Sequence, residues 1–247
     1  MTNPGAFMAE LVDADEDPEI GQELIRVRYA DGRTEQLRLH DYERLYGLPG
    51  VYEQIVQERL GCRSPQQVAA LLAETVDALG WERRSMRVID IAAGNGVSGE
   101  ALAANGLRAV LGSDITPAAR AAALRDRPGL YDDYRTLDLL RLSADDRARI
   151  AGLRATILSC VAPVGDHAVP PGALLAAAGL LAGDALVAHL HDVELLDADP
   201  VTAQLFSGAG LAAQELVRRR YVHRQTVGGA PYEMEAVVWR LRRPQAQ

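Results

Sequence analysis

A glycine-rich turn holds the residues of this chain whose spacing most directly suggests ligand chemistry. The stretch VIDIAAGNGVSGEAL begins at Val88, and its small residues follow a run that is typical of a buried strand. Glycine lets the backbone approach a ligand closely, and the helix that follows offers unpaired N–H groups. Asp114 comes 20 residues after Gly94, a spacing that suits the ribose hydroxyls of an adenosine. The turn is therefore predicted to bind an adenosine-containing cofactor.

Two cofactors fit this turn, and the charges nearby favour one of them. From Gly94 to Gly99 the turn matches G-x-G-x-x-G, which is typical of a dinucleotide site. A dinucleotide has an anionic pyrophosphate that the carboxylate of Asp90 would oppose, whereas S-adenosylmethionine has an ammonium and a sulfonium that it would attract. Asp138, at the end of the third predicted strand, adds a possible acceptor for an adenine amino group. S-adenosylmethionine is therefore favoured as the cofactor, and the alternative is the nicotinamide cofactor of an oxidoreductase.

Strands and helices alternate from residue 81 onward, and they would position the turn. Five extended runs (MRVIDIA, RAVLGSD, YRTLDL, ATILSCV and DALVAHL) are separated by helical patterns, which predicts βαβ units and a parallel sheet. Two longer extended runs then flank the segment Gly228 to Pro231 and predict a terminal antiparallel hairpin. A dinucleotide domain does not usually close in this way, so the hairpin also favours S-adenosylmethionine.

The chain before residue 81 is predicted to form a tail and a cap. Residues 1–20 are rich in acidic and small residues and are expected to be a partly disordered tail. Residues 21–80, the predicted cap, begin with a hairpin around Asp31-Gly32 and continue as helices, with Ser64-Pro65 capping the helix that reaches Leu79. Residues 81–247 are the predicted core.

The cap also contains an aromatic cluster that is predicted to form a lid over the cofactor, which would exclude water and complete the substrate pocket. Its members are Tyr42, Tyr46 and Tyr52. The alternative is that these rings only pack the cap onto the core.

In motif and architecture, residues 85–243 resemble the class I S-adenosylmethionine-dependent methyltransferases. The resemblance implies a Rossmann-like doubly wound sheet of seven strands with one antiparallel strand, and S-adenosylhomocysteine as the product. Ala92 stands where the family has the first glycine of its D-x-G-x-G-x-G loop. The cofactor-binding residues that the resemblance implies are Asp90, Ala92, Gly94, Asn95, Gly96, Asp114, Ile115, Asp138, Leu139 and Ser159. A weaker resemblance, over VGDHAVPPGALLAAAGLLAGDALVAHL, is to the Williams–Beuren-region methyltransferase-like branch.

Methyl transfer needs an acceptor held in line with the methyl group and shielded from water, and a base only when the acceptor keeps its proton. His167 is the candidate base, because it lies in a proline-stiffened loop after ATILSCV. The alternative is a loop histidine that is solvated or only shapes the pocket. His191 is the second catalytic candidate. With His189 and Asp192 it also suggests a metal site, but a lone H-x-H is a weak signal and no metal is predicted.

Composition limits the kind of partner. The formal net charge is -8, which argues against a broad nucleic-acid surface. The chain has 2 cysteines, no signal-like N-terminus and no apolar run long enough for a membrane, so a cytoplasmic protein is expected. The prediction is methyl transfer to a small molecule by a monomer or homodimer. A cofactor-binding protein or a cyclase on the same fold, neither transferring methyl, is a further alternative.

Overall fold

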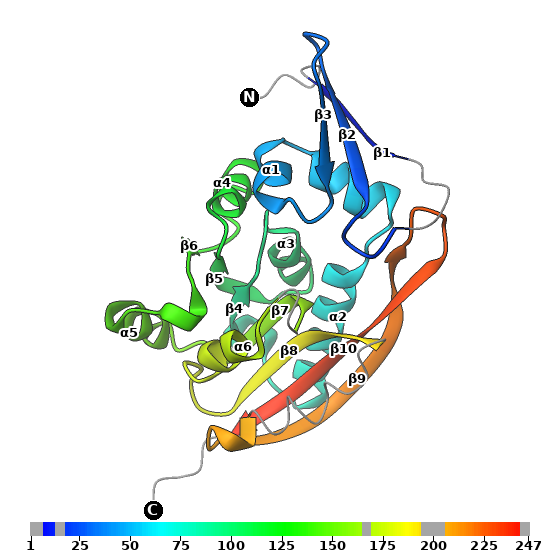
Figure 1. Cartoon of the computed structure of the whole chain (residues 1–247). Helices are drawn as coiled ribbons and strands as arrows, with labels where there is room; N and C mark the ends of the chain where they lie inside the picture. Colours follow the sequence, from blue (N-terminus) through cyan, green and yellow to red (C-terminus); the bar gives the residue numbers. More distant parts are fainter. Residues whose placement is uncertain (1–6, 13–17, 165–168, 194–205, 243–247) are drawn as a thin grey trace, which may run out of the picture.

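A computed structural model describes residues 7–12, 18–164, 169–193 and 206–242, and its main feature is a seven-stranded sheet (Figure 1). The strands lie in the order β6-β5-β4-β7-β8-β10-β9. They are β4 (Arg87–Ile91), β5 (Arg108–Asp114), β6 (Asp133–Thr136), β7 (Ile157–Pro163), β8 (Ala185–Asp192), β9 (Ala212–Gln225) and β10 (Pro231–Arg242). Only β10 runs antiparallel to its neighbours, β8 and β9. The predicted doubly wound sheet with a terminal antiparallel hairpin is confirmed.

Helices cover both faces of this main sheet. They are α2 (Ser64–Ala78), α3 (Val97–Ala104), α4 (Pro117–Asp126), α5 (Ala144–Gly152) and α6 (Pro171–Ala178). One face packs on α2 and α3 through Val88 and Leu186, and the other packs on α5 and α6 through Ile89 and Leu158. Because β4 is covered on both sides, its apolar run is interrupted only by Asp90. Within the described ranges, no helix has the length and apolarity needed to cross a membrane.

A small second sheet, backed by short helices, forms a cap with its own apolar centre (Figure 1). Its elements are β1 (Phe7–Leu11), β2 (Leu24–Tyr29), β3 (Thr34–Arg38), α1 (Tyr42–Gly47) and the π-helix η1 (Glu53–Arg59). Ile25, Leu37 and Ile55 are buried at its centre. Helix α2, which the sequence places in the cap, packs instead with α3 and the main sheet. The name cap is therefore used below for residues 7–12 and 18–63.

Two local predictions are wrong. Phe7–Leu11 lies in the predicted tail but forms β1, which pairs antiparallel with β2 and buries Ala9. The N-cap position of α2 is occupied by Arg63, which makes no side-chain cap hydrogen bond, and Ser64 is the first residue of the helix. Its Oγ lies instead 2.5 Å from His223 Nδ1 and 2.6 Å from the hydroxyl of Tyr221. Those partners lie in β9, far along the chain, so a local capping rule does not anticipate them.

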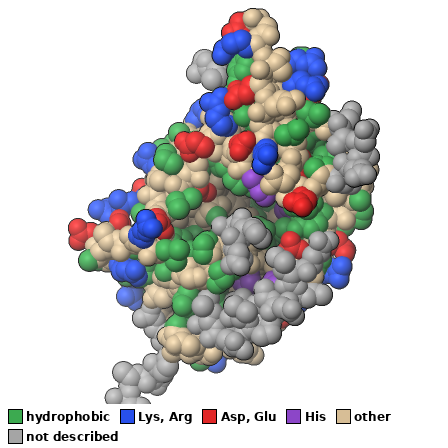
Figure 2. Space-filling model, in the orientation of Figure 1, with side chains coloured by type: hydrophobic (Ala, Val, Ile, Leu, Met, Phe, Trp, Pro, Cys, Tyr) green, Lys and Arg blue, Asp and Glu red, His purple; other side chains and the backbone are tan. Residues whose placement is uncertain are grey.

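The end of β9 attaches the cap to the main sheet. The backbone N–H of Arg63 donates to the carbonyl of His223 at 2.9 Å. Arg224 and Glu23, both buried, form an ion pair between β9 and the cap. Breaking such a pair leaves a buried, uncompensated charge and costs about 3–5 kcal/mol. The cap is therefore fixed at the carboxyl edge of the sheet, and Figure 2 shows a hollow between the two, with histidine side chains at its walls.

Candidate cofactor and acceptor site

The glycine turn lies between the carboxyl end of β4 and the start of α3, as the sequence predicts. Three of its residues have a left-handed backbone: Ala92 at φ 51, Gly94 at φ 54 and Gly96 at φ 93. Glycine adopts this conformation without steric cost, whereas an alanine pays about 1–2 kcal/mol. The surrounding structure must therefore hold Ala92 in place.

Asp90 lies beneath the turn and is completely buried. Its Oδ2 accepts hydrogen bonds from Ser98 Oγ at 2.6 Å and from the Tyr131 hydroxyl at 2.9 Å. Burial raises the pKa of Asp90 to about 6, although the two hydroxyl donors act in the opposite direction. The site thus holds a carboxyl group whose negative charge is poorly compensated by the protein itself.

Asp114, at the end of β5, holds the turn from the side. Its Oδ2 accepts from the backbone N–H of Gly94 at 3.0 Å, and its Oδ1 accepts from that of Thr116 at 2.9 Å. The Tyr134 hydroxyl donates to the carbonyl of Gly94 at 2.5 Å. Asp114 therefore lies where the sequence analysis expects it, and it has a structural task there. Its role toward a ribose stays a prediction, and Tyr134 carried no signal in the sequence.

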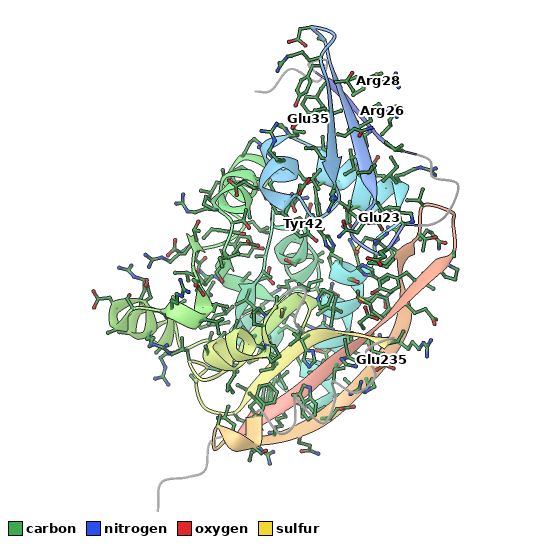
Figure 3. The ribbon with its side chains drawn as sticks, in the orientation of Figure 1. Glu23, Arg26, Arg28, Glu35, Tyr42 and Glu235 are labelled. Carbon is green, nitrogen blue, oxygen red and sulfur yellow. The ribbon has the colours of Figure 1, made fainter. Side chains whose placement is uncertain are left out.

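A cavity of about 490 Å³ opens beside Asp114, between the cap and the start of α4. Tyr42, Ile115 and Thr116 are among the residues that line it. The side chain of Ile115 is 66% exposed at this cavity, and its predicted contact with the cofactor stays a prediction. Figure 3 shows Tyr42 on the part of the cap that lies toward the main sheet.

The remaining predicted cofactor residues follow β6 and β7. Asp138 begins a short 3-10 helix, Leu139–Arg141, and its Oδ1 accepts from the backbone N–H of Leu140 at 3.0 Å. Leu139 is partly buried against the main core. Ser159 is fully buried in β7, in register with Asp90 of β4. The structure places all three at the expected edge or strand, and their cofactor contacts stay predictions.

The three predicted lid tyrosines form a row of neighbouring rings, called the tyrosine stack below, and its middle ring, Tyr46, meets the turn. Ring centroids are 5.7 Å apart for Tyr42 and Tyr46 and 5.2 Å apart for Tyr46 and Tyr52. The Tyr46 hydroxyl lies so close to Gly94 that a Cβ at that position would collide with it. Burial raises the pKa of Tyr46 and Tyr52 well above the usual value for tyrosine, so both remain neutral. The stack lies against the turn, and its action as a lid stays a prediction.

A second contact between cap and turn was not anticipated from the sequence. Glu53 Oε1 accepts from Asn95 Nδ2 at 2.8 Å and from Arg127 Nη1 at 2.9 Å. Arg127 also donates to the carbonyl of Asn95 at 3.1 Å and to Glu100 at 2.8 Å. Glu53 and Arg127 lie far from the glycine motif in the sequence and belong to no motif themselves, so no local pattern joins them to Asn95.

His191 lies at the carboxyl end of β8 and is buried. Its Nε2 has no hydrogen-bond partner among the residues that the structure describes. His189 is bound elsewhere, because its Nε2 accepts from Trp239 Nε1 at 3.2 Å. In the described part of the chain, no group of three or more His, Cys, Asp or Glu residues is arranged to hold a metal. His167 lies outside the described residues, so its role stays a prediction.

His223 is a further histidine at this edge, and the sequence analysis assigns it no catalytic role. Its ring packs edge-to-face on Tyr232, with centroids 5.6 Å apart, and the Tyr232 hydroxyl donates to Asp192. Burial, and then the charge of Arg224, lower the pKa of His223 to about 3. His223 is therefore neutral at physiological pH, and Ser64 fixes its Nδ1 side.

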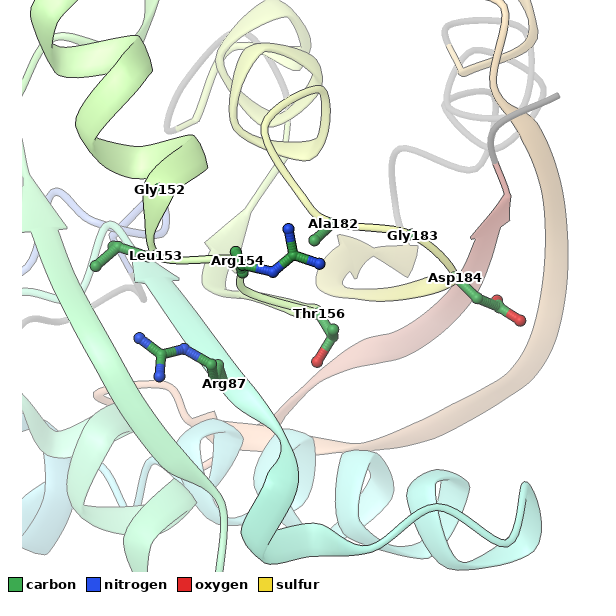
Figure 4. A pocket seen from close by; sticks show the side chains of 8 residues that line it. All are labelled: Arg87, Gly152, Leu153, Arg154, Thr156, Ala182, Gly183 and Asp184. Atoms are coloured by element: carbon green, nitrogen blue, oxygen red, sulfur yellow. The ribbon is translucent and has the colours of Figure 1, made fainter. Parts of the chain in front are cut away.

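A separate cavity of about 520 Å³ lies at the opposite edge of the main sheet (Figure 4). Arg87, Arg154 and Asp184 are among its lining residues. It adjoins the starts of β4 and β8, whereas ligands of doubly wound sheets bind beyond the carboxyl ends of the strands. It is therefore not part of the site described above.

No family model and no curated protein matches the sequence. Solved structures do match its fold. The chain is similar to the carbon methyltransferase CurJ, with a TM-score of 0.54 and 14% sequence identity, covering 83% of this chain and 62% of that one. It is also similar to ribosomal protein L11 methylase from Lactobacillus delbrueckii subsp. bulgaricus, with a TM-score of 0.50 and 17% identity, covering 72% and 78%.

At these identities the likeness shows the fold, which is that of the class I S-adenosylmethionine-dependent methyltransferases. The fold that the sequence resemblance implies is thereby confirmed. One of these neighbours is named a carbon methyltransferase and the other a protein methylase, so the fold does not define the acceptor.

Proposed function

We propose that the protein is an S-adenosylmethionine-dependent methyltransferase that acts on a small molecule. The observation that carries the proposal is the left-handed glycine turn at the carboxyl end of β4, with Asp90 beneath it and Asp114 beside it. In a doubly wound sheet this edge is the place where ligands bind. The carboxylate of Asp90 opposes a pyrophosphate and suits a sulfonium and an ammonium, whereas Asp114 suits the ribose of either cofactor. S-adenosylmethionine therefore fits the site better than a nicotinamide dinucleotide.

Each part of the proposed site has a limited task. S-adenosylmethionine supplies an electrophilic methyl group. Asp114 would accept hydrogen bonds from the ribose hydroxyls, and the turn would lie against the methionine part, where only small residues leave room. The tyrosine stack would exclude water from the reacting groups. His191 Nε2, buried at the end of β8, would hold or accept the proton of an acceptor hydroxyl, and His167 is the other candidate for this task.

The acceptor is proposed to be small because the cap encloses the carboxyl edge of the main sheet. The buried pair of Arg224 and Glu23 fixes the cap there, leaving the hollow seen in Figure 2. The net charge of -8 opposes a polyanionic acceptor such as RNA.

Calorimetric titration of the purified protein with S-adenosylhomocysteine and, separately, with NADH tests the cofactor. We expect S-adenosylhomocysteine to bind and NADH to give no signal. Native mass spectrometry of the freshly purified protein should show the mass of S-adenosylmethionine or S-adenosylhomocysteine. Binding of NADH without binding of S-adenosylhomocysteine would overturn the assignment in favour of an oxidoreductase.

A further inference from the structure

Glu53 brings a carboxylate from the cap to the glycine turn. It is the first residue of η1, and one of its oxygens, Oε1, accepts from Asn95 and Arg127. The other oxygen, Oε2, is buried and has no hydrogen-bond partner among the described residues. A carboxylate oxygen accepts two hydrogen bonds, and leaving a buried acceptor unused costs free energy. Oε2 is therefore suited to a donor that belongs to a ligand.

The partner of Glu53 identifies which part of a ligand this would be. Asn95 lies between the two left-handed glycines of the turn and is buried. The hydroxyl of Tyr46, also from the cap, lies against Gly94. Two cap side chains thus reach the segment that the proposed function assigns to the methionine part of the cofactor.

The charges around the turn call for a cation at this place. Arg127 is shared between Glu53 and Glu100, at 2.9 Å and 2.8 Å, so one guanidinium serves two carboxylates. Asp90 and Asp114 add two more carboxyl groups at the same turn. The methionine part of S-adenosylmethionine carries an α-ammonium, which has only donors and a positive charge. Such a group both supplies the hydrogen-bond donor that Oε2 lacks and reduces the excess of negative charge at the turn.

We propose that Glu53 binds the α-ammonium of the cofactor through Oε2, so that the cap forms part of the cofactor site. The proposal rests on the proposed function, because it takes S-adenosylmethionine or its product as the ligand. It gives the cap a task beyond enclosing the acceptor: the cofactor would bridge η1 and the turn. Selectivity for ligands with a free amino group would then depend on a residue outside the glycine motif.

Calorimetry with three ligands isolates this contact. S-adenosylhomocysteine has the ammonium, its deaminated analogue has hydrogen in its place, and 5′-methylthioadenosine lacks the whole amino-acid part. We expect Glu53→Gln to lower the affinity for S-adenosylhomocysteine about tenfold or more, which is the effect expected from the loss of a charge-assisted hydrogen bond. Affinities for the other two ligands should change by less than about threefold, because they make no contact with Oε2.

Glu35→Gln is the matched control. Glu35 lies in β3 of the same cap and also pairs with an arginine, Arg44 at 2.6 Å, but it makes no contact with the turn (Figure 3). This variant should bind all three ligands as the wild type does. If Glu53→Gln does not fold, as judged by circular dichroism, Glu53→Asp withdraws the carboxylate by one methylene and should show the same selective loss.

Equal weakening of all three ligands by Glu53→Gln would overturn the proposal and leave Glu53 as a residue that only holds the turn. Unchanged affinity for S-adenosylhomocysteine would overturn it as well. Failure of the proposed function has a different signature, because the wild-type protein would then bind none of the three adenosine ligands.

Discussion

The buried carboxyl group of Asp90 links the proposed function to a measurable cost in stability. Burial raises its pKa from the ordinary 3.8 to about 6. One pKa unit corresponds to about 1.36 kcal/mol, so holding this group ionised in the folded protein costs up to about 3 kcal/mol. A free-energy cost of this size is a large part of the stability of an ordinary domain. Asp90→Asn removes the charge and retains an oxygen that can accept from Ser98 and Tyr131.

The direction of the pH dependence follows from the raised pKa. The folded state holds the proton more tightly than the unfolded state, so between about pH 4 and pH 6 the free energy of unfolding falls as the pH rises. Above about pH 6 the wild-type protein carries the whole cost. The Asn variant carries none of it, so its advantage should be up to about 3 kcal/mol at pH 7.5 and about half of that at pH 5.

Urea unfolding of both proteins at the two pH values, without ligand, measures this difference directly. Asp90→Ala is the contrasting variant, since it leaves the hydroxyls of Ser98 and Tyr131 without their acceptor and should be less stable than Asp90→Asn. The same Asn substitution should weaken the binding of S-adenosylmethionine, because the attraction of the carboxylate for its positive groups is lost. An Asn variant that is less stable than the wild type at pH 7.5, or equally shifted at both pH values, would refute the reasoning.

Three further predictions concern the turn and the acceptor side. Asp114→Ala should lower the affinity for S-adenosylhomocysteine, measured by calorimetry, at least about tenfold, because it removes an acceptor for the ribose hydroxyls and for the Gly94 N–H. Unchanged affinity would contradict this prediction. Gly94→Val should abolish the binding of S-adenosylhomocysteine, while its circular dichroism spectrum should remain that of the wild type. Because the new Cβ would meet Tyr46, that ring must shift for the variant to fold. Retained binding would count against the proposed site. Once an acceptor is known, replacing His167 or His191 with alanine should lower turnover by about 10²-fold for whichever of the two is the base. The affinity for S-adenosylhomocysteine should stay within about threefold of the wild type. If both variants are fully active, catalysis depends on positioning alone.

Those parts of the fold that depend on local pattern could be predicted from the sequence. The run RAVLGSD corresponds to β5, Arg108–Asp114, because a strand buried on both faces reads as a short apolar run with few charges. The carboxyl ends of parallel strands meet at one edge of a sheet. The parallel course of β4, β5 and β8 therefore brings Asp90, Asp114 and His191 to the same edge. Their joint placement follows from topology.

The parts that could not be predicted depend on contacts between distant segments. Ser64 has the residue type and place of a helix cap, but a histidine and a tyrosine of β9 compete for its hydroxyl. Glu53 resembles any charged residue on the surface of a helix until folding places it beside Asn95. No periodicity or motif encodes such pairs, because the sequence around one member gives no indication of its distant partner.

These distant contacts also explain how the turn tolerates Ala92 in a left-handed conformation. A residue with strained backbone persists only where its surroundings fix it from several sides. Asp114 from β5 and Tyr134 from β6 hold the turn through Gly94, and Glu53 of the cap holds it through Asn95. The turn is therefore shaped by the folded protein before any ligand arrives. The cost of ordering it falls on folding and is not subtracted from the affinity for the cofactor.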